Sequence, residues 1–181
     1  KFSKENRWGY FPSAAAAWRI SSEPFMKGTS KWLDDLKLRF SYGTAGNNNI
    51  PSGQLTQVYE NNTTSWINGI SNYWAPSTYM SNPDLKWEYS NELNIGIEGR
   101  FLNNRLSGEV NYFRELRKNI IGINSAKYAT IGGNFIPSEN IGEVLNQGID
   151  ACVNWNDKVG EDFTYNLGFN ITFTKNKLRK T

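Results

Sequence analysis

The stretch NPDLKWEYSNELNIGIEGRFLNNRLSGEVNYF, residues 82–113, decides the fold. Apolar or small side chains take alternate positions on both sides of a central Asn-Asn pair, at Leu93, Ile95, Ile97, Phe101, Leu106, Gly108, Val110 and Tyr112. A period of two residues is typical of β-strands, and Asn103 with Asn104 between the two runs predicts a hairpin turn. Each run continues for about ten residues or more, whereas strands of soluble proteins usually have about 5–6. The sequence therefore predicts two unusually long antiparallel strands.

The same alternation recurs along the chain of 181 residues. It predicts about six strands, at residues 11–20, 36–45, 88–102, 105–116, 141–156 and 163–174. The last segment is the most regular, with one face formed by Phe163, Tyr165, Leu167, Phe169, Ile171 and Phe173. We expect an all-β fold in which the strands follow one another as an antiparallel meander.

The two faces of these strands indicate a membrane environment. The polar face consists mainly of Asn, Thr, Gly and Ser, which suits a water-filled lumen, and rings such as Tyr42 and Trp155 near strand ends suit membrane interfaces. We therefore expect part of a transmembrane β-barrel wall. The side chains predicted to face lipid are Leu93, Ile95, Ile97 and Leu167, and those predicted to face the lumen are Arg39, Glu98, Arg100 and Glu109. For the lumen charges, pairing with each other or with a plug is favoured over substrate binding.

The connections alternate between short and long. Short links are expected at 21–35, 103–104 and 157–162, and long ones at 47–86 and 117–140. Transmembrane barrels have short periplasmic turns and long extracellular loops, so the long links are predicted to be extracellular. The first long loop contains Trp66, Tyr73, Trp74 and Tyr79, which are candidates for contact with a substrate or a lid. The alternative is that these rings pack the loop against itself.

The composition argues against several other functions. The chain has no histidine, which removes Ser-His and Cys-His catalysis and the common zinc ligand sets. The carboxylate pairs at Asp34 with Asp35 and at Glu161 with Asp162 fall in predicted turns, so no enzyme and no cofactor is expected. The net charge of +3 is spread along the chain, which disfavours nucleic-acid binding. A mean hydropathy of −0.61 and the lack of a long apolar run exclude a transmembrane helix.

Four stretches in order resemble the C-terminal part of the barrel in the SusC/RagA family of TonB-dependent outer-membrane transporters. They are NRWGYFPSAAAAWRISSEPFM (6–26), LKLRFSYGTAGNNNI (36–50), NPDLKWE with the hairpin that follows it (82–113), and NIGEVLNQGIDACVNWN (140–156). The resemblance implies a barrel of about 22 strands in the outer membrane of a Gram-negative bacterium. It also implies a plug energised by TonB, a SusD-like surface lipoprotein as partner, and import of glycans or oligopeptides.

Six strands cannot close such a barrel, because open sheet edges are not viable in lipid. Residues 1–181 are therefore expected to be a partial C-terminal barrel region, with the plug and the remaining strands outside this chain. Two alternatives remain. One is a soluble, secreted, carbohydrate-binding β-sandwich, in which the apolar face of 163–173 would pack against a second sheet. The other is a surface receptor or adhesin barrel that does not transport.

Overall fold

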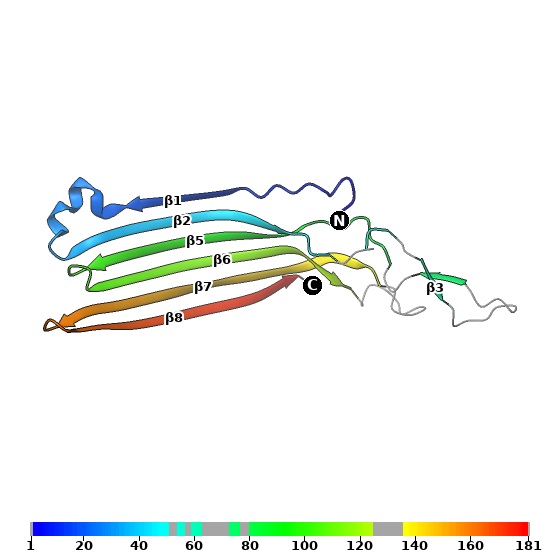
Figure 1. Cartoon of the computed structure of the whole chain (residues 1–181). Coiled ribbons are helices and arrows are strands. Elements are labelled where there is room, and N and C mark those ends of the chain that lie inside the picture. The colour runs from blue at the N-terminus through cyan, green and yellow to red at the C-terminus, as the bar shows by residue number, and fades with distance from the viewer. Residues whose placement is uncertain are drawn as a thin grey trace.

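The computed structural model describes residues 2–50, 54–56, 59–62, 73–76, 80–124 and 136–180. Its main element is a six-stranded sheet in the order β1-β2-β5-β6-β7-β8, and every neighbouring pair is antiparallel. The strands are β1 (Ser13–Arg19), β2 (Leu33–Asn47), β5 (Glu88–Phe101), β6 (Leu106–Ile123), β7 (Ser138–Val159) and β8 (Phe163–Lys180). The predicted all-β antiparallel meander is confirmed (Figure 1).

Two smaller features accompany the sheet. β3 (Tyr59–Asn62) and β4 (Tyr73–Pro76) form a two-stranded ribbon inside the segment that was predicted to be a long loop. Two 3₁₀ segments, η1 (Ile20–Ser22) and η2 (Pro24–Thr29), connect β1 to β2. In the part of the chain that the structure describes, no helical segment has the length and apolar character needed to cross a membrane.

The last three strands are longer than predicted. β6 continues to Ile123 rather than ending near residue 116, and β8 continues to Lys180 rather than ending near residue 174. The apolar alternation stops before the strands do, because the backbone ladder also pairs polar residues such as Gln147 with Lys175. The hydrophobic pattern therefore marks only the part of each strand that carries an apolar face.

The turn between β5 and β6 is wider than the predicted Asn-Asn pair. Phe101 pairs with Leu106, so four residues connect the strands, and Leu102, Asn103 and Asn104 all have positive φ values of 57°, 58° and 61°. A left-handed conformation is unusual for leucine. Neighbouring groups hold the turn: the Asn104 N–H donates to Asp34 Oδ2 at 2.9 Å, and the Leu102 N–H donates to the Trp32 carbonyl at 3.0 Å.

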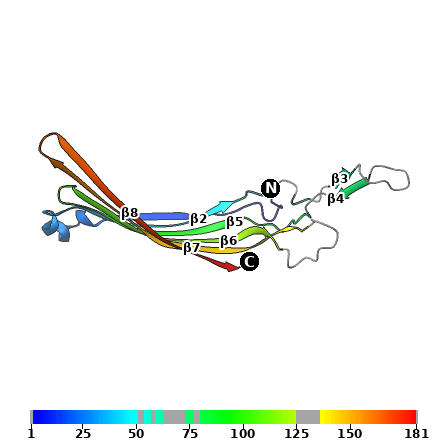
Figure 2. The ribbon, with the colours of Figure 1, turned by 90° about the horizontal axis from the view of Figure 1, so that it is seen from below.

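The sheet has two distinct ends. In Figure 1 the three connections β1–β2, β5–β6 and β7–β8 lie at one end, whereas both termini and the β3–β4 ribbon lie at the other. Seen from below, the sheet is strongly twisted, and β8 crosses the direction of β2 (Figure 2). Successive links thus lie at alternate ends of the sheet, as predicted. The links at 102–105 and 160–162 are short and the link at 48–87 is long, whereas the links at 20–32 and 124–137 have similar lengths, so the predicted contrast in length holds only in part. We call the two ends the turn end and the loop end.

A small hydrophobic core closes the loop end. Phe2, Ile50 and Leu85 are buried together, and the side chain of Leu85 has no exposed surface. Asn140 ties the adjoining backbone, since its amide donates to the carbonyls of Lys86 (2.9 Å) and Asn119 (2.8 Å). Its Oδ1 also accepts from the Lys86 N–H at 2.8 Å. The NPDLKWE stretch thus joins the loops to the sheet.

Neither broad face of the sheet is covered by a second layer in the described residues. Phe169 and Phe173 of β8 are each 66% exposed. Many apolar side chains of the neighbouring strands are also exposed. In a soluble sandwich these side chains would be buried against another sheet. The described residues therefore do not form the core between two sheets that the β-sandwich alternative requires.

Candidate functional site: the polar face of the sheet

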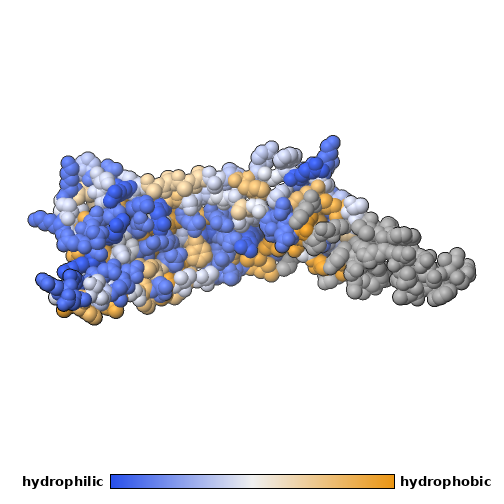
Figure 3. All heavy atoms as spheres, viewed as in Figure 1, coloured by the Kyte–Doolittle hydropathy of each residue, from blue (hydrophilic) through white to orange (hydrophobic). Residues whose placement is uncertain are grey.

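The strand register places three polar side chains and one glycine, from four neighbouring strands, in one row. Arg39 of β2 lies opposite Gly96 of β5, Gly96 opposite Asn111 of β6, and Asn111 opposite Asp150 of β7. Because side chains alternate between the faces of a sheet, these positions share one face. We call it the polar face, and hydrophilic residues cover most of the sheet surface seen in Figure 3.

Arg39 is the centre of a charged network on this face. Its Nη2 donates to Glu109 Oε1 at 2.8 Å and to Asn111 Oδ1 at 3.1 Å. Its Nε lies 3.5 Å from Glu98 Oε2, and Lys37 Nζ lies 3.2 Å from the other oxygen of Glu98. The network therefore neutralises two carboxylates with two cations across three strands.

The network extends to β7 through Asn111. The Asn111 amide donates to Asp150 Oδ2 at 2.9 Å and also to Glu109 Oε1. These side chains are partly exposed, so water screens the charges and each contact contributes modestly to stability. Their combined effect is to hold the side chains in fixed positions on the face.

Gly96 makes this bridge possible. A Cβ atom at position 96 would lie 2.1 Å from Asn111 Oδ1 and 3.3 Å from Arg39 Nη2. Any larger residue would therefore push the two side chains apart. The absence of a side chain on β5 lets Arg39 reach over that strand to β6.

A second group of charges lies nearer the turn end. Asp35 Oδ1 accepts from Arg19 Nε at 2.7 Å and from Ser21 Oγ at 2.8 Å, and Arg100 Nη2 lies 3.4 Å from Oδ2. The Asp35 side chain is only 12% exposed. It thus links β1, the 3₁₀ segment η1 and β5.

Shallow depressions flank these networks. One is lined in part by Asp35, Glu98, Arg100 and Cys152, and another in part by Arg39 and Asp150. The Cys152 thiol accepts a hydrogen bond from Asn154 Nδ2 at 3.3 Å, which is a structural role. Among the described residues, no three Cys, Asp or Glu side chains are grouped so that they could hold a metal ion. The described part of this face offers charges and hydrogen bonds.

The four charges predicted from the sequence lie on this one face. Arg39, Glu98 and Glu109 are in direct contact, and Arg100 pairs separately with Asp35. Lys37, Asn111 and Asp150 also belong to the network. Their place in the alternation identifies the face, but their partners follow only from the strand register.

The side chains predicted to face lipid lie on the opposite face. Ile95 is paired with Phe40 and Tyr112, and Ile97 with Leu38 and Val110. Leu93 lies one row towards the loop end, and Leu167 of β8 lies opposite Trp155 of β7 towards the turn end. We call this the apolar face.

The aromatic residues of the long loop are described only in part. Tyr73 and Trp74 lie in β4, where their backbones pair with Asn62 and Asn61. Trp66 and Tyr79 lie outside the described residues. Their contact with a substrate or lid stays a prediction.

A single sheet of long antiparallel strands, polar on one face and apolar on the other, defines a segment of a transmembrane β-barrel wall. The family model described as "TonB dependent receptor-like, beta-barrel" matches residues 1–181. The chain belongs to this family, whose members are outer-membrane proteins of Gram-negative bacteria. That assignment places the chain in the outer membrane, excludes the soluble sandwich, and agrees with the expectation that the protein is not an enzyme.

Two relatives illustrate the similarity. The TonB-dependent receptor SusC of Bacteroides thetaiotaomicron is 37% identical over 186 residues, a match that covers 99% of this chain and 18% of SusC. The TonB-dependent receptor P26 of Formosa agariphila is 32% identical, with 98% of this chain and 18% of P26 covered. The chain thus spans about a fifth of the length of these relatives.

Solved structures give the same result. The RagAB peptide importer in its "closed-closed" state superposes with a TM-score of 0.87 at 27% identity, covering 99% of this chain and 19% of the matched chain. The siderophore receptor PirA of Pseudomonas aeruginosa has a TM-score of 0.55 at 17% identity, so it shares the fold alone. The resemblance to SusC and RagA seen in the sequence is confirmed.

Proposed function

We propose that this chain forms part of the barrel wall and of the extracellular loops of a TonB-dependent importer. The importer takes up nutrients, either glycans and oligosaccharides or oligopeptides, together with a SusD-like surface lipoprotein. Residues 1–181 supply the C-terminal region of the barrel, and the plug and other strands lie elsewhere in the polypeptide. The observation that carries the proposal is the polar face, which presents the paired charges of Arg39, Glu98 and Glu109 across three strands.

In this proposal the polar face lines the lumen and the apolar face contacts lipid. The charges Arg39, Glu98, Arg100 and Glu109 are paired within the wall, so they add polarity without strong selectivity for one sign of charge. A wall of this kind suits passage of a hydrated solute, with TonB acting through the plug. The turn end is periplasmic, and the loop end, which carries Tyr73 and Trp74 of β4, is extracellular. Contact of Trp66, Tyr73, Trp74 and Tyr79 with a substrate or lid belongs to the same proposal.

The likenesses to RagAB and SusC support import, and the likeness to RagAB supports a peptide substrate. RagAB is described as a peptide importer, and its structure resembles this chain at 27% identity. SusC is described as a TonB-dependent receptor and is 37% identical. These likenesses favour import through a barrel of the same family. The SusD-like lipoprotein partner is proposed from the likeness to RagAB and SusC.

The test is an uptake experiment with the complete gene. The experiment compares a deletion strain, the same strain complemented with the gene, and a strain without TonB. Each strain is grown on defined mixtures of oligosaccharides and of oligopeptides, and the depletion of each solute from the medium is measured by mass spectrometry. We expect the deletion and the loss of TonB to abolish uptake of solutes from one class. Unchanged uptake of every solute, with intact surface binding, would instead support a receptor or adhesin that does not transport.

The assignment of the two faces has its own test. Phe169 and Asn170 are neighbours in β8 on opposite faces, opposite Val153 and Cys152 of β7. Arginine on the lipid side near the bilayer midplane costs about 2–4 kcal/mol, whereas a lumen position is hydrated. We expect Phe169→Arg to reduce the amount of folded transporter in the outer membrane and Asn170→Arg to leave it nearly unchanged. Equal losses, or a larger loss for Asn170→Arg, would refute the orientation.

A further inference from the structure

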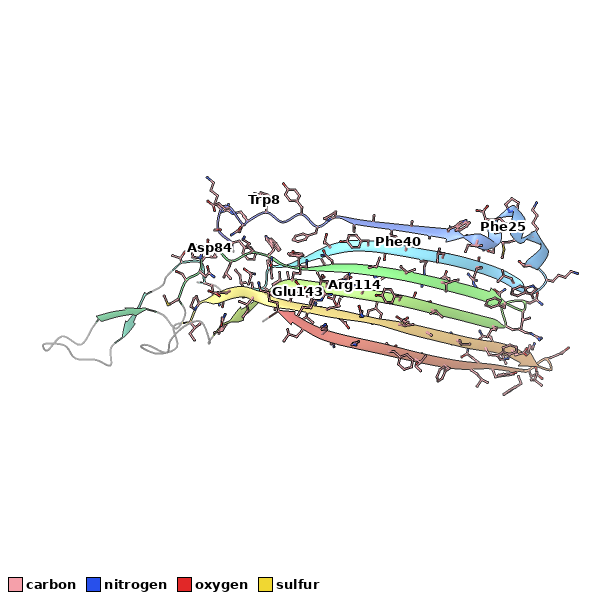
Figure 4. The ribbon with its side chains drawn as sticks, turned by 180° about the vertical axis from the view of Figure 1, so that it is seen from behind. Trp8, Phe25, Phe40, Asp84, Arg114 and Glu143 are labelled. Carbon is pink, nitrogen blue, oxygen red and sulfur yellow. The ribbon has the colours of Figure 1, made fainter. Side chains whose placement is uncertain are left out.

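The apolar face ends in a group of cations towards the loop end. On β8, Phe173 is followed on the same face by Lys175 and Lys177, and on β6 Tyr112 is followed by Arg114. Figure 4 labels Arg114 on β6 nearer to the loop end than Phe40, which belongs to the apolar rows. We call Arg114, Lys175 and Lys177 the basic group.

The basic group has no partner among the described residues. None of its three side chains forms a hydrogen bond or an ion pair there, whereas Arg19, Arg39 and Arg100 on the polar face are all paired. The nearest carboxylate that the structure describes on the same face is Glu143, which lies 3.5 Å from Arg179 and is thereby engaged. The described part of the sheet therefore leaves the three cations available to an external anion.

The three cations lie close enough to act together. Arg114 and Lys175 both pair with Gln147, one from each side, so their Cα atoms are about 10 Å apart at the usual strand spacing. Lys177 lies two residues further along β8, or about 7 Å. Long flexible side chains at these positions can converge on a single phosphate-bearing headgroup.

Their height relative to the membrane follows from the length of the apolar rows. Residues 163–173 of β8 extend about 33 Å along a strand, and a tilt of about 40° reduces their height to about 25 Å, the height of the apolar band of an outer-membrane barrel. Lys175 is the next residue on that face. The basic group therefore begins where the hydrocarbon ends and the headgroups of the outer leaflet start.

We propose that the basic group binds the phosphate groups of lipopolysaccharide in the outer leaflet. Arginine can hold a phosphate through two parallel hydrogen bonds, and lysine adds charge. The rows directly beneath, with Tyr112, Ile149 and Phe173, offer an apolar surface to the acyl chains of the same molecule. That second contact distinguishes a lipid from free phosphate. The inference rests on the orientation given under the proposed function.

The test uses the complete transporter in phosphatidylcholine nanodiscs, titrated with lipid A. The variant Arg114→Gln/Lys175→Gln/Lys177→Gln removes the basic group. The matched control Lys27→Gln/Lys31→Gln/Lys158→Gln removes the same charge from the turn end. Each cation near an anionic membrane surface is worth about a fivefold change in binding, so we expect a loss of roughly 100-fold for the first variant and little change for the control.

Further measurements decide the interpretation. Dephosphorylated lipid A is expected to bind the original protein as weakly as lipid A binds the triple variant, and inorganic phosphate is expected not to compete. Equal binding by both triple variants, or displacement by inorganic phosphate, would overturn the proposal. Folding of each variant is checked by heat modifiability, and Arg114→Lys is expected to keep most of the binding should the triple variant misfold. If the triple variant loses lipid A binding but takes up nutrients normally, the lipid site is supported separately from the proposed import function.

Discussion

Replacement of Gly96 by alanine should break the charged network of the polar face. The new Cβ would lie 2.1 Å from Asn111 Oδ1, so the Asn111 amide must turn away. That movement removes the hydrogen bond from Arg39 (3.1 Å) and those to Asp150 (2.9 Å) and Glu109. At the low end of the usual range, about 0.5 kcal/mol for each bond, the three bonds contribute about 1.5 kcal/mol together.

The substitution also has a favourable part. Alanine has less backbone freedom than glycine in the unfolded chain, which returns about 0.5 kcal/mol. The expected net loss of local stability is therefore about 1 kcal/mol, or about a fivefold faster opening of the ladder. Hydrogen exchange of peptides from β5 and β6 in the complete transporter measures this change.

A double-mutant cycle gives the decisive result. With Asn111→Ala in place the clash is gone, so adding Gly96→Ala should slow exchange slightly, and the interaction energy between the two positions should be about 1.5 kcal/mol. The control is Gly108→Ala, whose Cβ would lie 3.7 Å from the Cys152 carbonyl oxygen, an ordinary contact. If Gly96→Ala changes exchange equally with and without Asn111, the reasoning is wrong.

Three other substitutions test the contacts that join the parts of the fold. Asp35→Asn removes the charged partner of the Arg19 and Arg100 guanidinium groups and should cost about 1–3 kcal/mol of stability. The loss should appear as faster proteolysis of residues 20–32. Asp162→Asn in the exposed turn is the control, and equal proteolysis of the two variants would contradict the prediction. Leu85→Ala empties a fully buried site and should cost about 2–5 kcal/mol, measured as faster exchange in residues 80–87, whereas Leu178→Ala on the exposed surface should not change it. Asn140→Ala removes three hydrogen bonds to backbone groups of Lys86 and Asn119 and should cost about 1–3 kcal/mol; protease sensitivity near residue 86 no higher than that of Asn176→Ala would contradict it.

The residues that reveal the family and the residues that serve the proposed function have different physical roles. The stretch NPDLKWE identified the chain because it is distinctive, and in the structure it forms the junction of loops and sheet around Leu85 and Asn140. Its described contacts are packing contacts and backbone hydrogen bonds. A distinctive motif can therefore mark a packing requirement, while the polar face that serves the proposed function is made of ordinary residues in an ordinary alternation.

The sequence by itself determined the type of secondary structure, the long strands and the two chemically different faces. This was possible because side-chain alternation is a local property of a strand. Arg39 and Glu109 each have polar residues two positions before and after them in their own strand, and this pattern does not depend on which strand lies beside them. The predicted strand ends were less accurate, since the apolar pattern stops at Phe173 while backbone pairing continues to Lys180.

The tertiary structure alone decided which residues meet. Arg39 and Glu109 are 70 positions apart, and they touch because the register of β2, β5 and β6 places them around Gly96. That register depends on the four-residue turn after Phe101 and, in β6, on an irregularity after Arg117 where Asn119 has a positive φ of 56°. A shift of one residue would move every side chain to the other face, and the hydrophobic pattern of one strand does not specify its neighbour's offset.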